Sequence, residues 1–447
     1  MPNRRQRARW RFGAAAGTFL AGVALYALVG GGNASTGWTR VTIVQGIAGS
    51  NQPDGADGVY TATVNGGLAS VTGYEQGLKA SLTLHVGTAP ATVLLPSSGA
   101  NLCNPEDVTL ADMDNPADGA LDVVVLCESG VQKLQIFFQP TPPSSDAVLL
   151  DGANWTRVIV AASNGRQGIM RGVGVNITGD SALELVVGEK EASGPCGPAG
   201  VAYYSSPTPR VAASWTRTLI EPAGWVNQLY VQDFDGDGEL DIVYTDRERI
   251  DCLPDGTPSI DNTHQGANWL EGPTFARHLV TPPSQSNHEW FDIADWDGDG
   301  DLDMTDCYLP NGPLGDTSEM RIYINGGGAL TWSSVTVPPP LNVGLCKHVT
   351  MYDIDGDTDL DLGVSSSHAD APKRAVYWLE RTGTALAPAF VFHDVSGAIG
   401  AGSDVKFDNL LWRDCNGAGR LDALASEQHH PTGTGPGLGV VCYINPY

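Results

Sequence analysis

The chain has 447 residues, of which 42% are hydrophobic, so it is long and apolar enough to bury a large core. It contains 55 Gly and 29 Pro and few long helix-forming runs, which favours many short strands joined by turns. A formal net charge of −26 disfavours binding to the phosphate backbone of nucleic acids.

The N-terminal segment has the features of a targeting sequence. Five arginines precede an uncharged run at 12–32, and Gly32-Asn33-Ala34 offers a small-x-small cleavage site. We expect residues 1–34 to be a signal peptide. An uncleaved membrane anchor is the alternative, because the uncharged run is long enough to span a bilayer. With either segment, residues 35–447 are exported to the periplasm or the extracellular space.

Three sequence markers recur along the exported part with one period. An aromatic-led strand begins at Trp38, Trp155, Trp215, Phe275, Trp332 and Phe390. An alternating strand occupies 134–138, 201–204, 268–270, 321–324, 376–379 and 441–444. Acidic stretches begin at Asp112, Asn176, Asp233, Asp295, Asp353 and Asp414, at intervals of 57 to 64 residues. Three independent markers with the same period indicate a repeat array.

Each repeat is predicted to hold four strands, with the acidic loop between the first and the second. Four antiparallel strands per repeat favour the blade of a β-propeller. The interval from Trp38 to Trp155 spans two periods, so a first unit is expected there, with its loop at 51–57 and its fourth strand at 91–95. The sequence therefore predicts an all-β, seven-bladed propeller. The strand from Trp38 to Ile43 is expected to complete the blade that ends at Tyr443, which would close the ring and remove exposed strand edges.

The three central loops are nearly identical and carry carboxylates at alternate positions. Carboxylates so placed can curl around one hard cation, while the glycines permit the tight turn. The first half resembles an EF-hand loop, but the twelfth position from Asp233 is Tyr244 rather than Glu. A solvated acidic turn is the alternative. The expected Ca²⁺ ligands in these three sites are Asp233, Asp235, Asp237, Glu239, Asp241, Asp295, Asp297, Asp299, Asp301, Asp303, Asp353, Asp355, Asp357, Asp359 and Asp361.

Two further loops raise the expected number of Ca²⁺ sites to as many as five. The loop of the second unit is two residues longer, and that of the seventh has Ala418 at its fifth position. Their expected ligands are Asp112, Asp114, Asp118, Asp122, Asp414, Asn416 and Asp422. The loop at 176–184 keeps only two charges and is predicted to be a plain turn, and the first unit is predicted to bind no metal.

The repeated pattern of strand, D-x-D-G-D-G-x-x-D and strand resembles the FG-GAP/VCBS repeat of integrin α-subunit propellers and many bacterial exported proteins. The resemblance covers about Trp38 to Tyr447 and is most specific in the three central loops. It implies a seven-bladed propeller with Ca²⁺ between the first and second strands of a blade. The Phe-Gly-Gly-Ala-Pro sequence is absent, so the VCBS-like branch is closer. The resemblance implies no single activity.

Eight cysteines in an exported chain predict disulfides, and their spacing lacks a C-x₂-C zinc pattern. The strand order allows bridges within the second unit and between the fifth and sixth. The remaining cysteines lie in matching loops of units three and four, and in unit seven. The suggested pairs are Cys103 with Cys127, Cys307 with Cys346, Cys196 with Cys252, and Cys415 with Cys442.

The face opposite the acidic loops is expected to carry the function, because its loops can vary on a rigid ring. It collects Glu128, Glu189, Lys190, Asp246, Arg247, Glu248, Arg249, His288, Glu289, Trp290, Lys347, His348, His368, Glu427, His429 and His430. These side chains around a funnel could bind a sugar, a peptide or a second metal. A solvated polar rim explains the same set.

No G-x-S-x-G, H-E-x-x-H, Walker or dinucleotide motif occurs in the sequence. The leading hypothesis is an exported, calcium-stabilised binding or adhesion module for a glycan or a protein. One alternative is an accessory subunit of a membrane complex, tethered by residues 12–32. The other is a carbohydrate-active enzyme that uses the funnel face. A structure, a glycan array and the mature N-terminus distinguish them.

Overall fold

The structure is a computed structural model that describes residues 37–446 with several gaps. The gaps are 49–52, 76, 87–88, 98–101, 142–143, 167, 191–198, 248–250, 253–257, 260–264, 282–286, 312–316, 400–403 and 430–436. The expected targeting segment at 1–34 lies outside the described residues.

Consecutive strands pair in antiparallel order throughout the described part, and four of the sheets hold four strands each. The first contains β4 (Tyr60–Val64), β5 (Gly67–Tyr74), β6 (Lys79–Val86) and β7 (Ala89–Leu95). The second contains β8 (Asn104–Ala111), β9 (Asp122–Ser129), β10 (Leu134–Phe138) and β11 (Thr156–Ile159). The third contains β12 (Gly168–Val175), β13 (Glu184–Lys190), β14 (Gly200–Ser205) and β15 (Thr216–Pro222). The fourth contains β16 (Val226–Gln232), β17 (Asp241–Asp246), β20 (Gly266–Glu271) and β21 (Ala276–Leu279).

An eight-stranded sheet follows, and it consists of two four-stranded meanders. One contains β22 (His288–Ala294), β23 (Asp303–Tyr308), β24 (Glu319–Asn325) and β25 (Trp332–Val337). The other contains β26 (Leu345–Tyr352), β27 (Asp361–Ser367), β29 (Val376–Arg381) and β30 (Phe390–Asp394). A single parallel pair, Trp290 with His348, joins β22 to β26.

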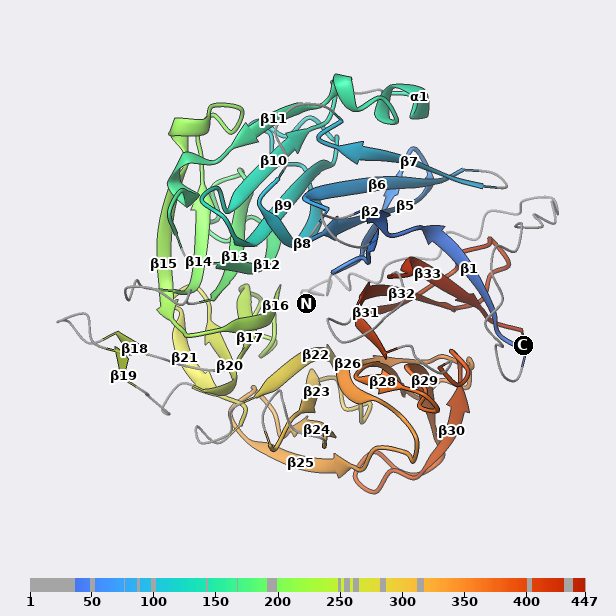
Figure 1. Cartoon of the computed structure of the whole chain (residues 1–447). Coiled ribbons are helices and arrows are strands. Elements are labelled where there is room, and N and C mark those ends of the chain that lie inside the picture. The colour runs from blue at the N-terminus through green and yellow to red at the C-terminus, as the bar shows by residue number, and fades with distance from the viewer. Residues whose placement is uncertain are drawn as a thin grey trace, which may run out of the picture.

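The last sheet brings the two ends of the described chain together. It contains β1 (Thr39–Val44), β33 (Gly439–Ile444), β32 (Asp422–His429), β31 (Asp404–Arg413) and β28 (Ala369–Asp370). Thr39 pairs with Ile444 and Val41 with Cys442, which confirms the predicted pairing of the first strand with the last. Figure 1 shows the sheets following one another around a ring, with blue β1 beside red β33. The fold is an all-β propeller.

The sheets differ from the prediction of seven separate four-stranded blades. Only four described sheets have four strands, because the bridge between Trp290 and His348 merges two meanders and the short β28 adds a fifth strand beside β31. The first addition joins the first strands of two neighbouring units, and the second joins a short segment after β27 to the first strand of the next unit.

The expected acidic loop of the first unit is wrong. Residues 53–54 form β3 (Pro53–Asp54), which pairs with β2 (Ile47–Ala48) ahead of the sheet. The first and second strands of this unit are joined instead by Asn65 and Gly66, with φ of 50° and 79°. An Asn-Gly pair suits such a tight turn, because both residues tolerate positive φ. The fourth strand predicted at 91–95 is confirmed within β7.

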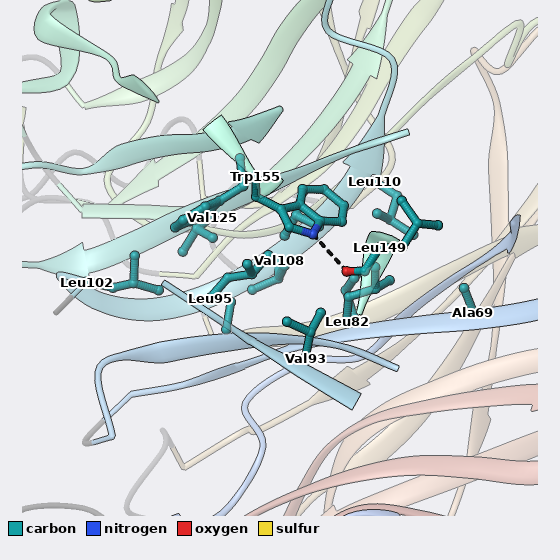
Figure 2. Packing of buried hydrophobic residues seen from close by; sticks show 14 of the residues in the cluster. Ala69, Leu82, Val93, Leu95, Leu102, Val108, Leu110, Val125, Leu149 and Trp155 are labelled. Carbon is teal, nitrogen blue, oxygen red and sulfur yellow. Dashed lines mark hydrogen bonds between the residues drawn. The ribbon is translucent and has the colours of Figure 1, made fainter. Parts of the chain in front are cut away.

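Two of the aromatic-led strands begin with a tryptophan whose indole bonds to the segment before the strand. The indole N–H of Trp155 donates to the carbonyl of Leu149 at 2.8 Å, and that of Trp215 donates to Pro209 at 2.9 Å. Figure 2 shows Trp155 among Val108, Leu95 and other apolar side chains of the first two sheets. The sequence marker therefore reflects a packing position between sheets.

The remaining described elements are short. They are α1 (Asp146–Leu149), the 3₁₀ turns Gly152–Asn154, Ala161–Ser163 and Ala212–Ser214, and the hairpin of β18 (Asp251–Cys252) with β19 (Pro258–Ser259). Among the residues that the structure describes, no helix has the length and apolar character needed to cross a membrane.

Candidate functional site

Six acidic loops join the first strand of a unit to its second. They connect β8 to β9, β12 to β13, β16 to β17, β22 to β23, β26 to β27 and β31 to β32. The first strands of neighbouring units contact one another and therefore line the axis of the ring. Because each of them runs into its loop, the six loops lie on one face, which we call the loop face. The opposite side is the far face.

A glycine at the fourth position allows each central loop to turn back on itself. Gly236, Gly298 and Gly356 have φ of 83°, 81° and 86°, a conformation that favours glycine. Their N–H groups donate to the first aspartate of the loop at 2.9, 2.8 and 2.7 Å. The third and fifth carboxylates accept from the N–H groups of the fifth and seventh residues in the same way. The turn is thus preformed by its own side chains.

Carboxylates of different loop positions come together in these turns. One oxygen each from Asp295, Asp297 and Asp299 lie within 4.8 Å of one another. The same holds for Asp233, Asp235 and Asp241, and for Asp112, Asp114 and Asp118. Oxygen donors at this separation fit a hard cation such as Ca²⁺, whose ligands lie about 2.3–2.6 Å from the ion. The loop at Asp295 thus groups its first, third and fifth carboxylates, whereas the loop at Asp233 groups its first, third and ninth.

The carboxylate at the ninth position has a structural role that the sequence did not reveal. One oxygen of Asp303 accepts the N–H of Trp296 at 2.8 Å and the other that of Asn325 at 2.7 Å. Asp122, Asp241, Asp361 and Asp422 each make the same two kinds of bond and are at most 1% exposed. This residue ties the loop to the third strand of its own unit.

Burial strongly affects the protonation of these ninth-position carboxyls. It raises the pKa of Asp122 to about 8 and that of Asp361 to about 7, although the backbone N–H groups act in the opposite direction. It raises the pKa of Asp303 and Asp422 to about 6. The neighbouring loop aspartates add to the shift. A nearby cation would counter that shift.

The other loops depart from the central three in specific contacts. In the second unit, Arg210 forms an ion pair with Asp114, which lies among the grouped carboxylates. In the seventh unit, Asp414 accepts the N–H groups of Gly417, Ala418 and Gly419, and Asn416 accepts that of Ala418. In the loop at 176–184, Asn176 and Asp180 accept backbone N–H groups and hold a turn, as the sequence predicted.

In the loop at Asp353, the carboxylate at the seventh position is already held in an ion pair. In the loop at Asp233, a carboxylate from outside the loop lies beside the predicted ligands. Asp359 lies 3.3 Å from the guanidinium of Arg381, so an ion pair occupies it. Glu271, at the end of β20, lies within 4.8 Å of the carboxylates of Asp235 and Asp237. It also pairs with His278 at 2.8 Å. Sequence analysis missed Glu271 because it lies in the third strand, thirty residues beyond the end of the loop.

At the far face, the first strands share a β-bulge that turns an extra residue toward the axis. Each first strand leaves one or two residues unpaired where it pairs with the next strand. One residue is left out in β8, β12, β16, β26 and β31, and two are left out in β22. The skipped residues are Glu106, Met170, Asn227, Lys347, Asp408, and the pair Glu289 and Trp290. Bulges commonly re-aim side chains in this way.

These far-face groups are mostly buried, so a solvated rim does not describe them. The buried members are Glu189, Asp246, Arg247, His288, Glu289, Trp290, Lys347, His348 and Glu427. Glu128, Lys190 and His368 are half-buried. Glu248, Arg249, His430 and the side chain of His429 lie outside the described residues.

Glu289 is the centre of the largest ionic contact at this face. Lys347 lies 2.7 Å from one of its oxygens and Arg247 3.2 Å from the other, and Asn227 donates to it at 2.9 Å. Burial alone raises the pKa of Glu289, but Arg247 and Lys347 outweigh it and lower the pKa to about 2. Glu289 is therefore ionised and internally paired, which suits a structural role better than proton transfer.

Two of the histidines predicted at this face, His288 and His348, are enclosed. The ring of His288 bonds to Asp306, and both side chains are fully buried. Burial, with the nearby Arg171 second, lowers the pKa of His348 to about 3. Trp290 packs against His348, with the ring centres 5.4 Å apart, and the Arg171 guanidinium lies 4.3 Å from the Trp290 ring centre. The side chains of His288, His348 and Trp290 are buried and not exposed at the surface of the far face.

An aromatic ring nearer the far-face surface is more accessible. Trp225 is half-buried, with the Lys190 ammonium 3.5 Å and the Arg247 guanidinium 4.5 Å from its ring centre. Lys190 in turn pairs with Glu128. Sequence analysis did not select Trp225, because it precedes its strand and matches no repeat marker.

Three of the suggested disulfides are confirmed. Cys103 bonds to Cys127, Cys307 to Cys346, and Cys415 to Cys442. The bridge between Cys307 and Cys346 joins two neighbouring units. The suggested partner of Cys252, Cys196, lies outside the described residues. Disulfides indicate an oxidising compartment.

Comparison with known proteins adds no family to this description. No family model matches the chain. No curated protein matches it either. Among solved structures, the Dos1 propeller is similar with a TM-score of 0.43 and 8% identity, over 90% of this chain and 96% of that one.

Two other solved structures have comparable scores. A puromycin-hydrolysing peptidase of Mycobacterium tuberculosis has a TM-score of 0.43 and 10% identity, over 84% of this chain and 50% of that one. The Nup170 N-terminal domain in complex with Nup53 from Chaetomium thermophilum has a TM-score of 0.42 and 8% identity, over 88% of this chain and 59% of that one.

Proposed function

We propose that the protein is an exported, calcium-stabilised binding module of the FG-GAP/VCBS type. In this proposal the ring has seven blades: the four four-stranded sheets, the two halves of the eight-stranded sheet, and β31, β32 and β33 completed by β1. The convergence of carboxylates in repeated loops carries the proposal, because like charges this close need a neutralising cation.

Calcium serves the scaffold in this proposal. Each ion is held by one hairpin, and the first, third and fifth carboxylates nearly enclose it, which leaves little room for a substrate. Mg²⁺ fits less well, since it requires strict six-fold geometry and retains its waters. The central loops at Asp233, Asp295 and Asp353 hold the three principal ions. The loops at Asp112 and Asp414 are weaker sites.

Export is supported by the confirmed disulfides together with the arginine-led, uncharged N-terminus. Recovery of the protein from its native compartment, followed by mass spectrometry of its N-terminus, tests this part. A chain that begins at about residue 35 supports a cleaved signal peptide. A full-length chain with eight alkylated, free thiols contradicts export.

The partner, a glycan or a protein, binds at the far face. The observation that favours this face is Trp225, a half-buried aromatic ring flanked by Lys190 and Arg247 beside Glu128. Aromatic rings bordered by polar groups are common in binding sites because they combine apolar contact with hydrogen-bond donors.

Glycan and protein arrays probed with calcium-loaded protein test this binding face. Trp225→Ala should abolish the binding of any ligand detected. Leu330→Ala, which removes a 64% exposed side chain at a turn of the loop face, is the matched control and should leave binding unchanged. Binding that survives Trp225→Ala but is lost with Leu330→Ala would place the partner on the loop face instead.

A further inference from the structure

A group of carboxylates lies at the far-face end of the axis, away from the acidic loops. Asp57 precedes β4, Glu106 is the bulged residue of β8, and Asp408 is the bulged residue of β31. They come from the first, second and last units of the ring. Each interacts electrostatically with the others and with Lys406.

Hydrogen bonds place the first and the last of these units in direct contact. The N–H of Ala56 donates to the carbonyl of Glu427 at 2.8 Å, and the amide of Asn409 donates to that of Val59 at 3.2 Å. The hydroxyl of Ser426 donates to the carbonyl of Asp57 at 3.3 Å. Segments near the two ends of the chain therefore meet at the carboxylates.

The local cations do not neutralise this group. Lys406 lies 3.1 Å from one oxygen of Asp408. Lys347 lies 3.8 Å from the same oxygen but only 2.7 Å from Glu289, which is its main partner. Asp57, Glu106 and Asp408 outnumber the one ammonium of Lys406, and Glu75 adds further negative charge nearby, so a divalent cation would reduce the excess.

Two carboxylate oxygens in the group have no partner although they are buried. Oδ2 of Asp57 and Oδ2 of Asp408 accept no hydrogen bond from the residues that the structure describes, and the two residues are 3% and 4% exposed. A buried acceptor without a partner is costly, and a charged one more so. An unsatisfied pair of oxygens from neighbouring units indicates that something binds between them.

The electrostatic surroundings agree with this geometry. Burial, followed by Glu106, Glu75 and Asp408, raises the pKa of Asp57 well above its usual value. Burial, followed by Glu128, raises the pKa of Glu106 to about 8. Burial lowers the pKa of Lys406, but Asp408, Asp57 and Glu106 outweigh it and raise that pKa. Burial is the main cause of the two raised carboxyl pKa values, and the neighbouring carboxylates add to it, whereas the raised pKa of Lys406 is due to those carboxylates alone.

We propose that Asp57, Glu106 and Asp408 bind one divalent cation on the axis of the ring. The ligands are hard carboxylate oxygens, so Ca²⁺ and Mn²⁺ are the ions that fit. Lys406 stays on the other oxygen of Asp408. Unlike a loop ion, which a single hairpin holds, this ion joins three units and ties the first unit to the last. It stabilises the closure of the ring together with the pairing of β1 and β33.

Crystals of the full exported chain, grown from stripped protein and soaked in Mn²⁺, provide the direct test. Anomalous scattering should show a peak between Asp57, Glu106 and Asp408 in addition to peaks at the acidic loops. Filled loops with no axial peak would overturn the proposal. An axial peak without loop peaks would support it while contradicting calcium in the loops, so the two proposals fail separately.

Solution stoichiometry provides the second test. Glu106→Gln changes a half-buried residue by one atom and should remove one bound Mn²⁺ ion and the axial peak, with the loop peaks unchanged. Asp297→Asn is the matched control, and it should remove a loop ion while the axial peak stays. Circular dichroism verifies that each variant folds. If folded Glu106→Gln binds as many ions as the wild type, the axial site does not exist.

Discussion

Arg210 and Asp114 form a two-pronged ion pair, with Nε 2.7 Å from Oδ1 and Nη2 2.6 Å from Oδ2. Asp114 occupies the third position of the acidic loop in the second unit, where the carboxylate of each central loop accepts a backbone N–H group instead. The guanidinium would therefore compete with the proposed Ca²⁺ ion for both oxygens. This contact distinguishes the second loop from loops that are otherwise similar in sequence.

Removal of this competitor should strengthen the second calcium site. Arg210→Gln is expected to increase the Ca²⁺ affinity of that loop without affecting the others, while the lost ion pair, 40% exposed on its arginine side, costs about 0.2–1 kcal/mol of stability at most. Calcium titration followed by calorimetry measures the change. Arg374→Gln, which breaks the pair with Asp394 outside the loops, is the control and should leave the isotherm unchanged.

The third-position carboxylate of the fifth unit should matter only when calcium is present. Asp297→Asn is expected to lower the melting temperature in Ca²⁺, because a site saturated at a hundredfold excess stabilises by about 2.7 kcal/mol. In stripped protein the same substitution should have little effect or should stabilise, since it removes one of several repelling charges. Asp180→Asn, in the loop at 176–184, is the control and should not depend on calcium. Equal effects of Asp297→Asn with and without Ca²⁺ would contradict the assignment.

The ninth-position carboxylate should behave in the opposite way. Asp303→Ala leaves the buried N–H groups of Trp296 and Asn325 without acceptors, at a cost of about 1–3 kcal/mol for each group. The loss should appear in urea denaturation both with calcium and without it. A loss confined to calcium-containing buffer would mean that Asp303 acts as a metal ligand alone.

The raised carboxyl pKa values predict how the stability of stripped protein depends on pH. In the folded state Asp303 and Asp422 titrate at about 6, Asp361 at about 7 and Asp122 at about 8, above the value of an unfolded carboxyl. Their contribution is therefore complete below about pH 4 and is lost as the pH rises through 6 to 8. The melting temperature of stripped protein should fall from pH 5.5 to pH 8.

Excess Ca²⁺ should reduce this dependence, because the ion compensates the same negative charge that the protons compensate at low pH. Thermal melts at both pH values, with and without calcium, measure it. A stripped protein that is more stable at pH 8 than at pH 5.5 would contradict the prediction.

Closure of the ring depends on β1, which is the first strand of the described chain and directly follows Trp38. Trp38 is 2% exposed and packs against Trp412 with ring centres 6.3 Å apart. Trp38→Ala should cost about 3–5 kcal/mol, the usual range for a buried tryptophan. Leu341→Ala, at a side chain that is 90% exposed, should cost almost nothing. Denaturant unfolding compares the two, and equal stabilities would show that β1 does not contribute to closure.

Periodicity was sufficient to predict the strands and the pairing of β1 with β33. A four-stranded unit repeats its buried tryptophan and its acidic turn at fixed places, so local residues such as Trp155 and Asp233 mark it. The loop of the first unit was predicted at 51–57, because acidic residues served as the marker. This prediction is wrong, since Asn65-Gly66 joins the first two strands of that unit. That Asn-Gly pair was the available signal.

Long-range partners explain the other differences. From the sequence alone, Glu289 is expected to be an exposed residue of a polar rim. The fold brings it next to Arg247 and Lys347, whose positive charges allow its burial. Arg210 likewise lies far along the chain from Asp114, and sequence spacing gives no indication of that contact. A sequence pattern predicts which possible ligands a loop carries. It does not predict which side chain of a neighbouring unit forms an ion pair with them.

The number of Ca²⁺ ions bound to the disulfide-intact protein tests the central claim most directly. Native mass spectrometry of stripped protein titrated with Ca²⁺ should show at least three ions. The combined variant Asp235→Asn, Asp297→Asn and Asp355→Asn should lose three of them and melt at a lower temperature. A wild-type protein that binds no calcium, or a triple variant that binds as many ions as the wild type and melts with it, would contradict the account.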